Sequence, residues 1–183
     1  LFRSGVLAGV LIESGAATTI AETIVRKLGE TRALLALALA TLILTAVGVF
    51  VDVAVITVAP IALAIARRAD LSKAAILLAM IGGGKAGNVM SPNPNAIAAA
   101  DAFHLPLTSV MAAGIIPGLF GLVMAYWLAK RLNKRGSKVA ADEVVNFDGG
   151  KLPGFFAAIS APLAAILLLA LRPVAGIVVD PQI

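Results

Sequence analysis

Long apolar runs separated by short polar stretches dominate the pattern of this chain. A membrane-spanning helix needs about 20 largely apolar residues, and runs of that kind cover Val6–Val25, Ala33–Ala66, Thr108–Ala129 and Leu152–Leu171. The apolar residues do not alternate with polar ones, as they do in the strands of an outer-membrane barrel. The pattern therefore predicts an all-α membrane protein, a multi-span helical bundle.

The run Ala33–Ala66 is too long for a single crossing. A straight helix over its 34 residues would reach about 51 Å, whereas the hydrocarbon core is about 30 Å thick. A glycine meets the run's one charged residue within Gly48–Asp52, so we expect the run to turn back there. A re-entrant hairpin over about residues 33–66 fits the short halves better than the alternative of two short helices.

A second interruption lies between the short apolar runs Ala74–Ile81 and Ala96–Ala102. The stretch between them, Gly82–Asn95, contains four glycines and two prolines, and both residue types disfavour regular helix. Irregular backbone at membrane depth is tolerated only where protein covers it or where it lines a wet cavity. We therefore expect a broken helix over about residues 72–104, with Gly82–Asn95 irregular. The alternative is an ordinary loop on the membrane surface.

Composition supports the membrane interpretation, and the placement of charge adds a topology. Hydrophobic residues make up 60% of the chain and charged residues 14%, against about half and a quarter in soluble domains. This excludes a typical soluble enzyme, and the absence of cysteine gives no sign of a disulfide-stapled module. The net charge is +5, and 12 of the 15 basic residues lie in three loops, which hold Arg26, Lys27 and Arg32, then Arg67, Arg68 and Lys73, then Lys130, Arg131, Lys134, Arg135, Lys138 and Lys151.

The positive-inside rule places these three loops in the cytoplasm, with Tyr126 and Trp127 at the cytoplasmic interface. The resulting organisation has three parts. Residues 1–130 form a membrane transport-domain segment that ends with a span over 107–129. Residues 131–151 form a cytoplasmic linker, and residues 152–183 begin a following membrane segment, so we expect the chain to be part of a longer protein.

The candidate chemistry lies in the second interruption. Lys85 is expected to be a buried cation without an acidic neighbour in sequence, and an anionic substrate would supply its counter-charge. Neutral donors and acceptors suited to hydroxyl and carboxylate oxygens surround it. The predicted substrate-binding set is Lys85, Asn88, Ser91, Asn93 and Asn95.

Two carboxylates are candidates for proton or ion coupling. Asp52 lies at the expected hairpin tip and Glu13 lies in a polar break of the first apolar run, and a carboxylate within the membrane is costly enough to suggest a function. The alternatives are a water-exposed tip for Asp52 and a hydrogen-bonded inter-helix contact for Glu13. His104, the one histidine, is expected to be a solvated loop residue. The glycine pairs Gly5/Gly9 and Gly114/Gly118 indicate close helix packing.

The sequence resembles the gluconate permease family of proton-coupled sugar-acid symporters, within the ion transporter superfamily. The matching pieces extend over about residues 5–130 and are Glu13–Ala17, Ile20–Thr23, Val51–Val53, Pro60–Ile61, Ile65–Arg68 and Ser91–Ala100. The resemblance implies a fragment from the middle of a longer bacterial inner-membrane protein with multiple spans. It also implies a transport domain that moves against a scaffold.

Two positions depart from the family pattern. Typical members carry Glu where this chain has Asp52, and a run of the type Pro-Pro-His-Pro-Gly-Pro where it has Ser91–Ala96. Because Asn93 stands in place of that His, proton coupling through the His does not carry over. The substrate could therefore differ from gluconate.

We therefore expect a proton symporter for a small organic anion such as gluconate or a related sugar acid. One alternative is a sodium-coupled di- or tricarboxylate transporter of the same superfamily, and another is a non-transporting membrane subunit. The sequence contains no catalytic motif of an enzyme, and we expect no cofactor, metal site or nucleic-acid partner. The expected partners are the organic anion, a proton or sodium ion and the lipid bilayer, and a homo-oligomer is left open.

Overall fold

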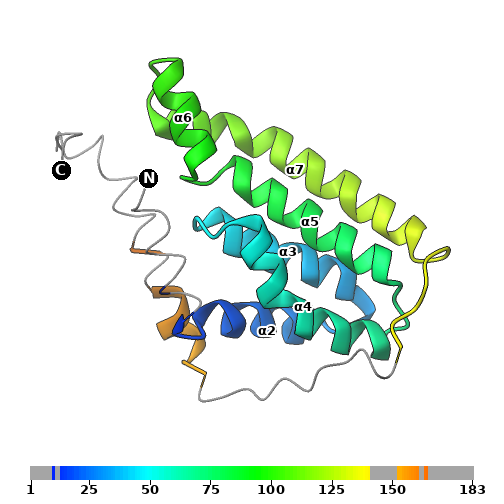
Figure 1. Cartoon of the computed structure of the whole chain (residues 1–183). Coiled ribbons are helices and arrows are strands. Elements are labelled where there is room, and N and C mark those ends of the chain that lie inside the picture. Colours follow the sequence, from blue (N-terminus) through cyan, green and yellow to red (C-terminus); the bar gives the residue numbers. More distant parts are fainter. Residues whose placement is uncertain (1–9, 11–12, 141–151, 161–162, 165–183) are drawn as a thin grey trace.

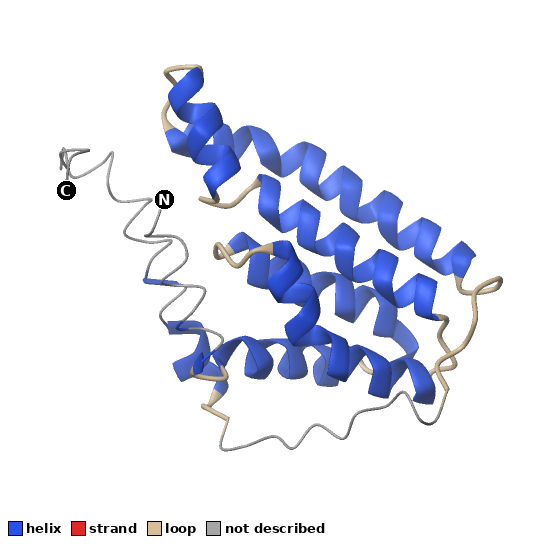
Figure 2. Ribbon diagram, viewed as in Figure 1, coloured by secondary structure: helices blue, strands red, loops and turns tan. Residues whose placement is uncertain are grey.

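A computed structural model describes residues 10, 13–140, 152–160 and 163–164 of the chain. The described elements are almost all helical, and no strand is assigned among them (Figure 2). In chain order they are α2 (Ala16–Leu28), the short 3-10 helix η1 (Glu30–Arg32), α3 (Ala33–Ala46), α4 (Val51–Arg68), α5 (Lys73–Val89), α6 (Pro94–Ala102) and α7 (Leu107–Leu132). The prediction of an all-α membrane protein is confirmed.

Two stretches of the described chain are long and apolar enough to cross a membrane by length and composition. They are α5 with α6, taken together as Lys73–Ala102, and α7. A third candidate is the pair Ala16–Leu28 and Glu30–Ala46, which bends by 105°. The predicted run Val6–Val25 is not one helix where it is described, because α2 begins at Ala16 after a left-handed Gly15 (φ 72°). The run Leu152–Leu171 lies mostly outside the described residues.

Helix α3 forms the centre of the bundle. Its sequence is apolar on every side, which is typical of a helix surrounded by protein, and Ala36, Leu37, Ala40 and Leu44 are fully buried. It packs against α2, α4, α5 and α7. The chain runs out along α3, turns at Val47–Phe50 and returns along α4 (Figure 1). The turn lies where the sequence predicts it, and Gly48 there takes a φ of 100° that favours glycine. Whether this hairpin is re-entrant in the membrane stays a prediction.

The glycine-rich stretch differs from its prediction. Helix α5 continues without interruption through Gly82–Gly87 to Val89, so only Met90–Asn93 is irregular. The glycines allow neighbouring helices to approach closely. A methyl group on Gly83 would overlap the carbonyl oxygen of Ala38 in α3, and one on Gly82 would overlap Ala125 in α7. Glycine costs about 1 kcal/mol per residue in a helix, and the close helix packing that it permits offsets this cost here.

Helix α7 uses the same device, as its glycine spacing predicts. A methyl group on Gly114 would overlap the carbonyl oxygen of Val89, and one on Gly118 would lie 2.9 Å from the carbonyl oxygen of Ala86. The packing role of Gly114 and Gly118 is therefore confirmed, whereas Gly5 and Gly9 lie outside the described residues.

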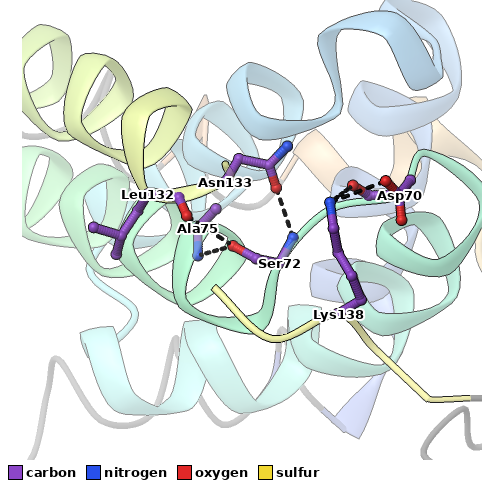
Figure 3. A network of polar contacts seen from close by, with 6 residues as sticks. All are labelled: Asp70, Ser72, Ala75, Leu132, Asn133 and Lys138. Atoms are coloured by element: carbon purple, nitrogen blue, oxygen red, sulfur yellow. Dashed lines mark hydrogen bonds and ion pairs between the residues drawn. The ribbon is translucent and has the colours of Figure 1, made fainter. Parts of the chain in front are cut away.

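The described parts of the three basic loops gather at one end of the bundle. Arg68 lies 4.0 Å from Glu30, which joins the loop before α3 to the end of α4. The backbone N–H of Ser72 donates to Asn133 Oδ1 at 2.6 Å, which joins the start of α5 to the end of α7 (Figure 3). The prediction that these loops share one side agrees with this arrangement. Their assignment to the cytoplasm stays a prediction.

A group of polar contacts joins the segment after α7 to the loop between α4 and α5 (Figure 3). We call this group the clasp; its residues are Asp70, Ser72, Asn133 and Lys138. Lys138 Nζ lies 3.0 Å from Asp70 Oδ2 and donates to the Asp70 carbonyl oxygen at 2.5 Å. Ser72 is fully buried, and its hydroxyl accepts the N–H of Ala75 at 3.2 Å, which caps α5. The clasp orders the first residues of the predicted linker 131–151, whose residues 141–151 are not described.

We expect Asn133→Ala to destabilise the protein by about 1–3 kcal/mol, because it leaves the N–H of a buried residue without its partner. Unfolding in mixed detergent micelles would measure the change. The matched control is Asn95→Ala, which removes an exposed amide and should stay within about 0.5 kcal/mol of the parent. Equal stability of the two variants would contradict a structural role for the clasp.

Candidate functional site

The break between α5 and α6 is held together by two buried polar side chains. Ser91 is 0% exposed and Asn93 is 3% exposed. Asn93 Oδ1 accepts the N–H groups of Asn95 and Ala96 at 2.7 and 3.1 Å, and Pro94 follows at the first helical position. Asn93 therefore acts as the N-cap of α6, a role that asparagine fills well. The Asn93 side chain thus occupies two backbone N–H groups at the start of α6.

The other side of the break is bonded in the same way. The hydroxyl of Ser91 donates to the carbonyl oxygen of Asn88 at 3.0 Å, and Asn93 Nδ2 donates to Ser91 Oγ at 3.1 Å and to the Asn88 carbonyl oxygen. Ser91 and Asn93 thus form hydrogen bonds with each other and with the backbone carbonyl group of Asn88. Their direct contact with a substrate stays a prediction.

Lys85, Asn88 and Asn95 lie on the two helices that flank the break. Lys85 is exposed on α5, Asn88 is half-buried one turn later, and Asn95 is exposed at the start of α6. The expectation that Lys85 is buried is wrong for the described chain, because the inward positions of this part of α5 belong to glycines that contact α3 and α4. Lys85 lies instead on an exposed stripe with Leu77, Ile81 and Val89. It makes no ion pair among the described residues.

Asp52 lies in the first turn of α4, directly after the hairpin turn. It is exposed among the described residues, and its role in coupling stays a prediction beside the alternative of a water-exposed tip. A carboxylate in the first turn of a helix is stabilised by the partial positive charge there. No ion pair of Asp52 occurs within the described chain.

The hairpin turn and the helix break lie side by side. A methyl group on Gly87 would overlap the Leu42 carbonyl oxygen and Thr45 Oγ1, and one on Gly84 would lie 2.9 Å from Val51 Cγ1. The residues that follow Gly84 and Val51 in sequence are Lys85 and Asp52. Lys85 on α5 and Asp52 on α4 thus follow two residues in contact, and we call this part of the bundle one neighbourhood. Figure 1 shows the hairpin turn and the helix break near each other.

Glu13 and His104 do not join this neighbourhood. Glu13 is exposed ahead of α2, and Figure 1 shows the start of α2 well separated from the break between α5 and α6. His104 is exposed with a φ of 52° in the connection between α6 and α7. His104 is thus in a connection between helices, as expected, and its contact with water stays a prediction.

The prediction overlooked two threonines in α3 that face the glycine stretch. Thr41 and Thr45 are fully buried, and Thr41 Oγ1 donates to the Leu37 carbonyl oxygen at 3.0 Å while Thr45 Oγ1 donates to that of Thr41 at 2.9 Å. Such back-bonding leaves hydroxyl lone pairs available next to α5. Their spacing of four residues in an otherwise apolar run was the signal that could have identified them.

Comparison with known proteins decides the family. The family described as "GntP family permease" matches residues 2–182. The chain belongs to the GntP permease family. The names of the family and of its relatives are those of permeases and transporters, and the apolar helices agree with a multi-span location in the bacterial inner membrane.

Relatives of this member of the GntP permease family differ in identity and in how specific their names are. An "Uncharacterized transporter" of Haemophilus influenzae is 75% identical over 183 residues, which are 100% of this chain and 44% of that protein. The "Inner membrane permease YgbN" of Escherichia coli is 35% identical over 72% of this chain and 29% of its own length. A "High-affinity gluconate transporter" of the same species is 27% identical over 94% of this chain and 39% of its own length.

The chain thus spans less than half of the length of these relatives. No solved structure gives a significant match to it.

Proposed function

We propose that the complete protein is a proton symporter for a small organic anion, such as gluconate or a related sugar acid. The observation that carries the proposal is the contact between Gly84 and Val51. Lys85 and Asp52 follow these two residues on adjoining helices, and neither has an ion pair among the described residues. An unpaired cation near a helix break is suited to bind an anion, and a nearby carboxylate is suited to carry a proton.

The proposed roles follow from position. Lys85 supplies the charge that attracts the anion, and Asn88 and Asn95 offer amide groups to its hydroxyl oxygens. Ser91 and Asn93 contribute to binding through the backbone of the break, which their hydrogen bonds hold in place. Asp52 carries the proton, and Glu13 assists coupling from the start of α2. The name of a gluconate transporter among the relatives supports the choice of substrate class.

Uptake by the full-length protein in proteoliposomes tests the coupling ion. We expect uptake of labelled gluconate to rise with an inward proton gradient and to stay at background with an inward sodium gradient alone. Asp52→Asn should abolish the response to the proton gradient, because an amide side chain does not bind and release a proton at the pH values of the assay. The control Asp101→Asn, which changes an exposed carboxylate on α6, should retain the response.

Two outcomes would overturn the proposal. Uptake driven by sodium alone would favour a sodium-coupled carboxylate transporter, and a full response in Asp52→Asn would remove the proton from that side chain. A screen of sugar acids and dicarboxylates by ligand-induced thermal shift would identify the substrate independently of the coupling ion.

A further inference from the structure

A basic pocket lies at the C-terminal end of α7, apart from the proposed transport site. It has a volume of about 550 Å³ and is lined by Trp127, Lys130, Arg131, Leu132, Lys134 and Arg135. Four of these six residues are cations and none is acidic. The pocket therefore has the electrostatic character of a binding site for an anion.

The four cations are not neutralised by carboxylates of the described chain. The ion pairs there are Arg68 with Glu30 and Lys138 with Asp70, and neither involves the pocket. Lys138, a few residues beyond Arg135, does form an ion pair with Asp70. A cation in this segment can therefore pair where a carboxylate is near. The described residues thus supply no counter-charge to the pocket.

Aromatic rings orient two of the cations. The guanidinium carbon of Arg131 lies 3.8 Å from the centre of the Trp127 ring, and Lys130 Nζ lies 5.4 Å from the centre of the Tyr126 ring. A guanidinium stacked on a ring keeps its N–H edge free, and that edge matches the oxygens of a phosphate. Trp and Tyr side chains also favour the level of the lipid headgroups.

An apolar stripe on α7 leads to the pocket. Its members recur at spacings of three and four residues and are therefore on one face of the helix. Ile116 is 80% exposed, Phe120 68% and Val123 61%, and Trp127 ends the stripe. From Ile116 to Trp127 the stripe extends for about 16 Å at the rise of an α-helix, which is close to the depth of one bilayer leaflet, about 15 Å.

We propose that this end of α7 binds an anionic phospholipid. Its phosphodiester lies in the pocket between Arg131, Lys134 and Arg135, and its acyl chains lie along the stripe from Val123 to Ile116. The shared chemistry of the pocket would also suit free phosphate, but free phosphate makes no use of the apolar stripe. The lipid is therefore the ligand that fits both features, and basic pockets at membrane helices bind anionic headgroups in this way.

Native mass spectrometry of the full-length protein with defined lipids tests the proposal. We expect phosphatidylglycerol to bind in preference to phosphatidylcholine. Arg131→Gln with Arg135→Gln should lower phosphatidylglycerol binding roughly tenfold. The matched control, Arg26→Gln with Arg67→Gln, removes the same charge from exposed positions on other elements and should leave the preference unchanged.

A competition arm separates the lipid from a soluble anion. Inorganic phosphate at millimolar concentration should not displace phosphatidylglycerol, whereas displacement would assign the pocket to a soluble anion and overturn the proposal. Equal loss of lipid in the test and control variants would reduce the pocket to general surface charge, and that also overturns it. The remaining rival ligand is the acidic linker of the chain itself. A preference for phosphatidylglycerol that arises only after Asp142→Asn with Glu143→Gln would assign the pocket to that linker and overturn the proposal.

Discussion

Replacing Gly83 by alanine is expected to cost this protein much of its stability, although alanine is the better helix former. The added methyl group would overlap the carbonyl oxygen of Ala38, and it would lie 2.7 Å from Thr41 Oγ1. The overlap is with backbone, which has no rotamer that relieves it. Overpacking of this kind costs about 1–3 kcal/mol and occasionally more, and we expect the upper end here because α3 is the central helix of the bundle.

The chain offers a control with the identical chemical change. Gly121 lies in α7 with no heavy atom within 4 Å of the position of an added methyl group. Gly121→Ala should leave stability unchanged or raise it by up to about 1 kcal/mol, because alanine has the higher helix propensity. The yield of monodisperse protein and its thermal unfolding in detergent would compare the two variants. Equal behaviour of both would contradict the close contact between α5 and α3.

Lys85→Gln is expected to have the largest effect on transport. The substitution keeps a polar side chain of similar length but removes the charge that attracts the anion. A hydrogen bond to a charged group contributes about 1.5–3 kcal/mol, so KM for uptake should rise at least about tenfold. Lys85→Arg should retain part of the affinity, because it keeps the positive charge.

The control for this variant is Arg67→Gln, which removes an exposed cation from the end of α4. Its KM should match that of the parent protein. Both variants would be measured in proteoliposomes at equal amounts of reconstituted protein, so that a folding defect is not mistaken for lost affinity. An unchanged KM in Lys85→Gln would remove Lys85 from the substrate site.

The structure brings two parts of the predicted site together but differs from the prediction in the burial of a side chain. Sequence reasoning identified Lys85 and Asp52 as outliers in apolar surroundings, and the structure brings their neighbours Gly84 and Val51 together. The sequence also suggested a buried Lys85, and Lys85 is exposed in the described chain. Sequence spacing indicates which residues share a helix, but the outward or inward direction of each one depends on the helices packed around it.

The sequence by itself determined the membrane class, the family and the turn after α3, and it indicated a second interruption whose extent it overestimated. Apolar runs of spanning length are stable in the hydrocarbon core of a bilayer. A turn at Gly48 follows because a continuous helix over residues 33–66 would be far too long for that core. The tertiary structure alone decided what the glycines do. Intrinsic propensity argues against a helix through Gly82–Gly87, but α3, α4 and α7 approach so closely there that only glycine fits. Contacts between elements far apart in sequence therefore outweighed the local preference of the chain.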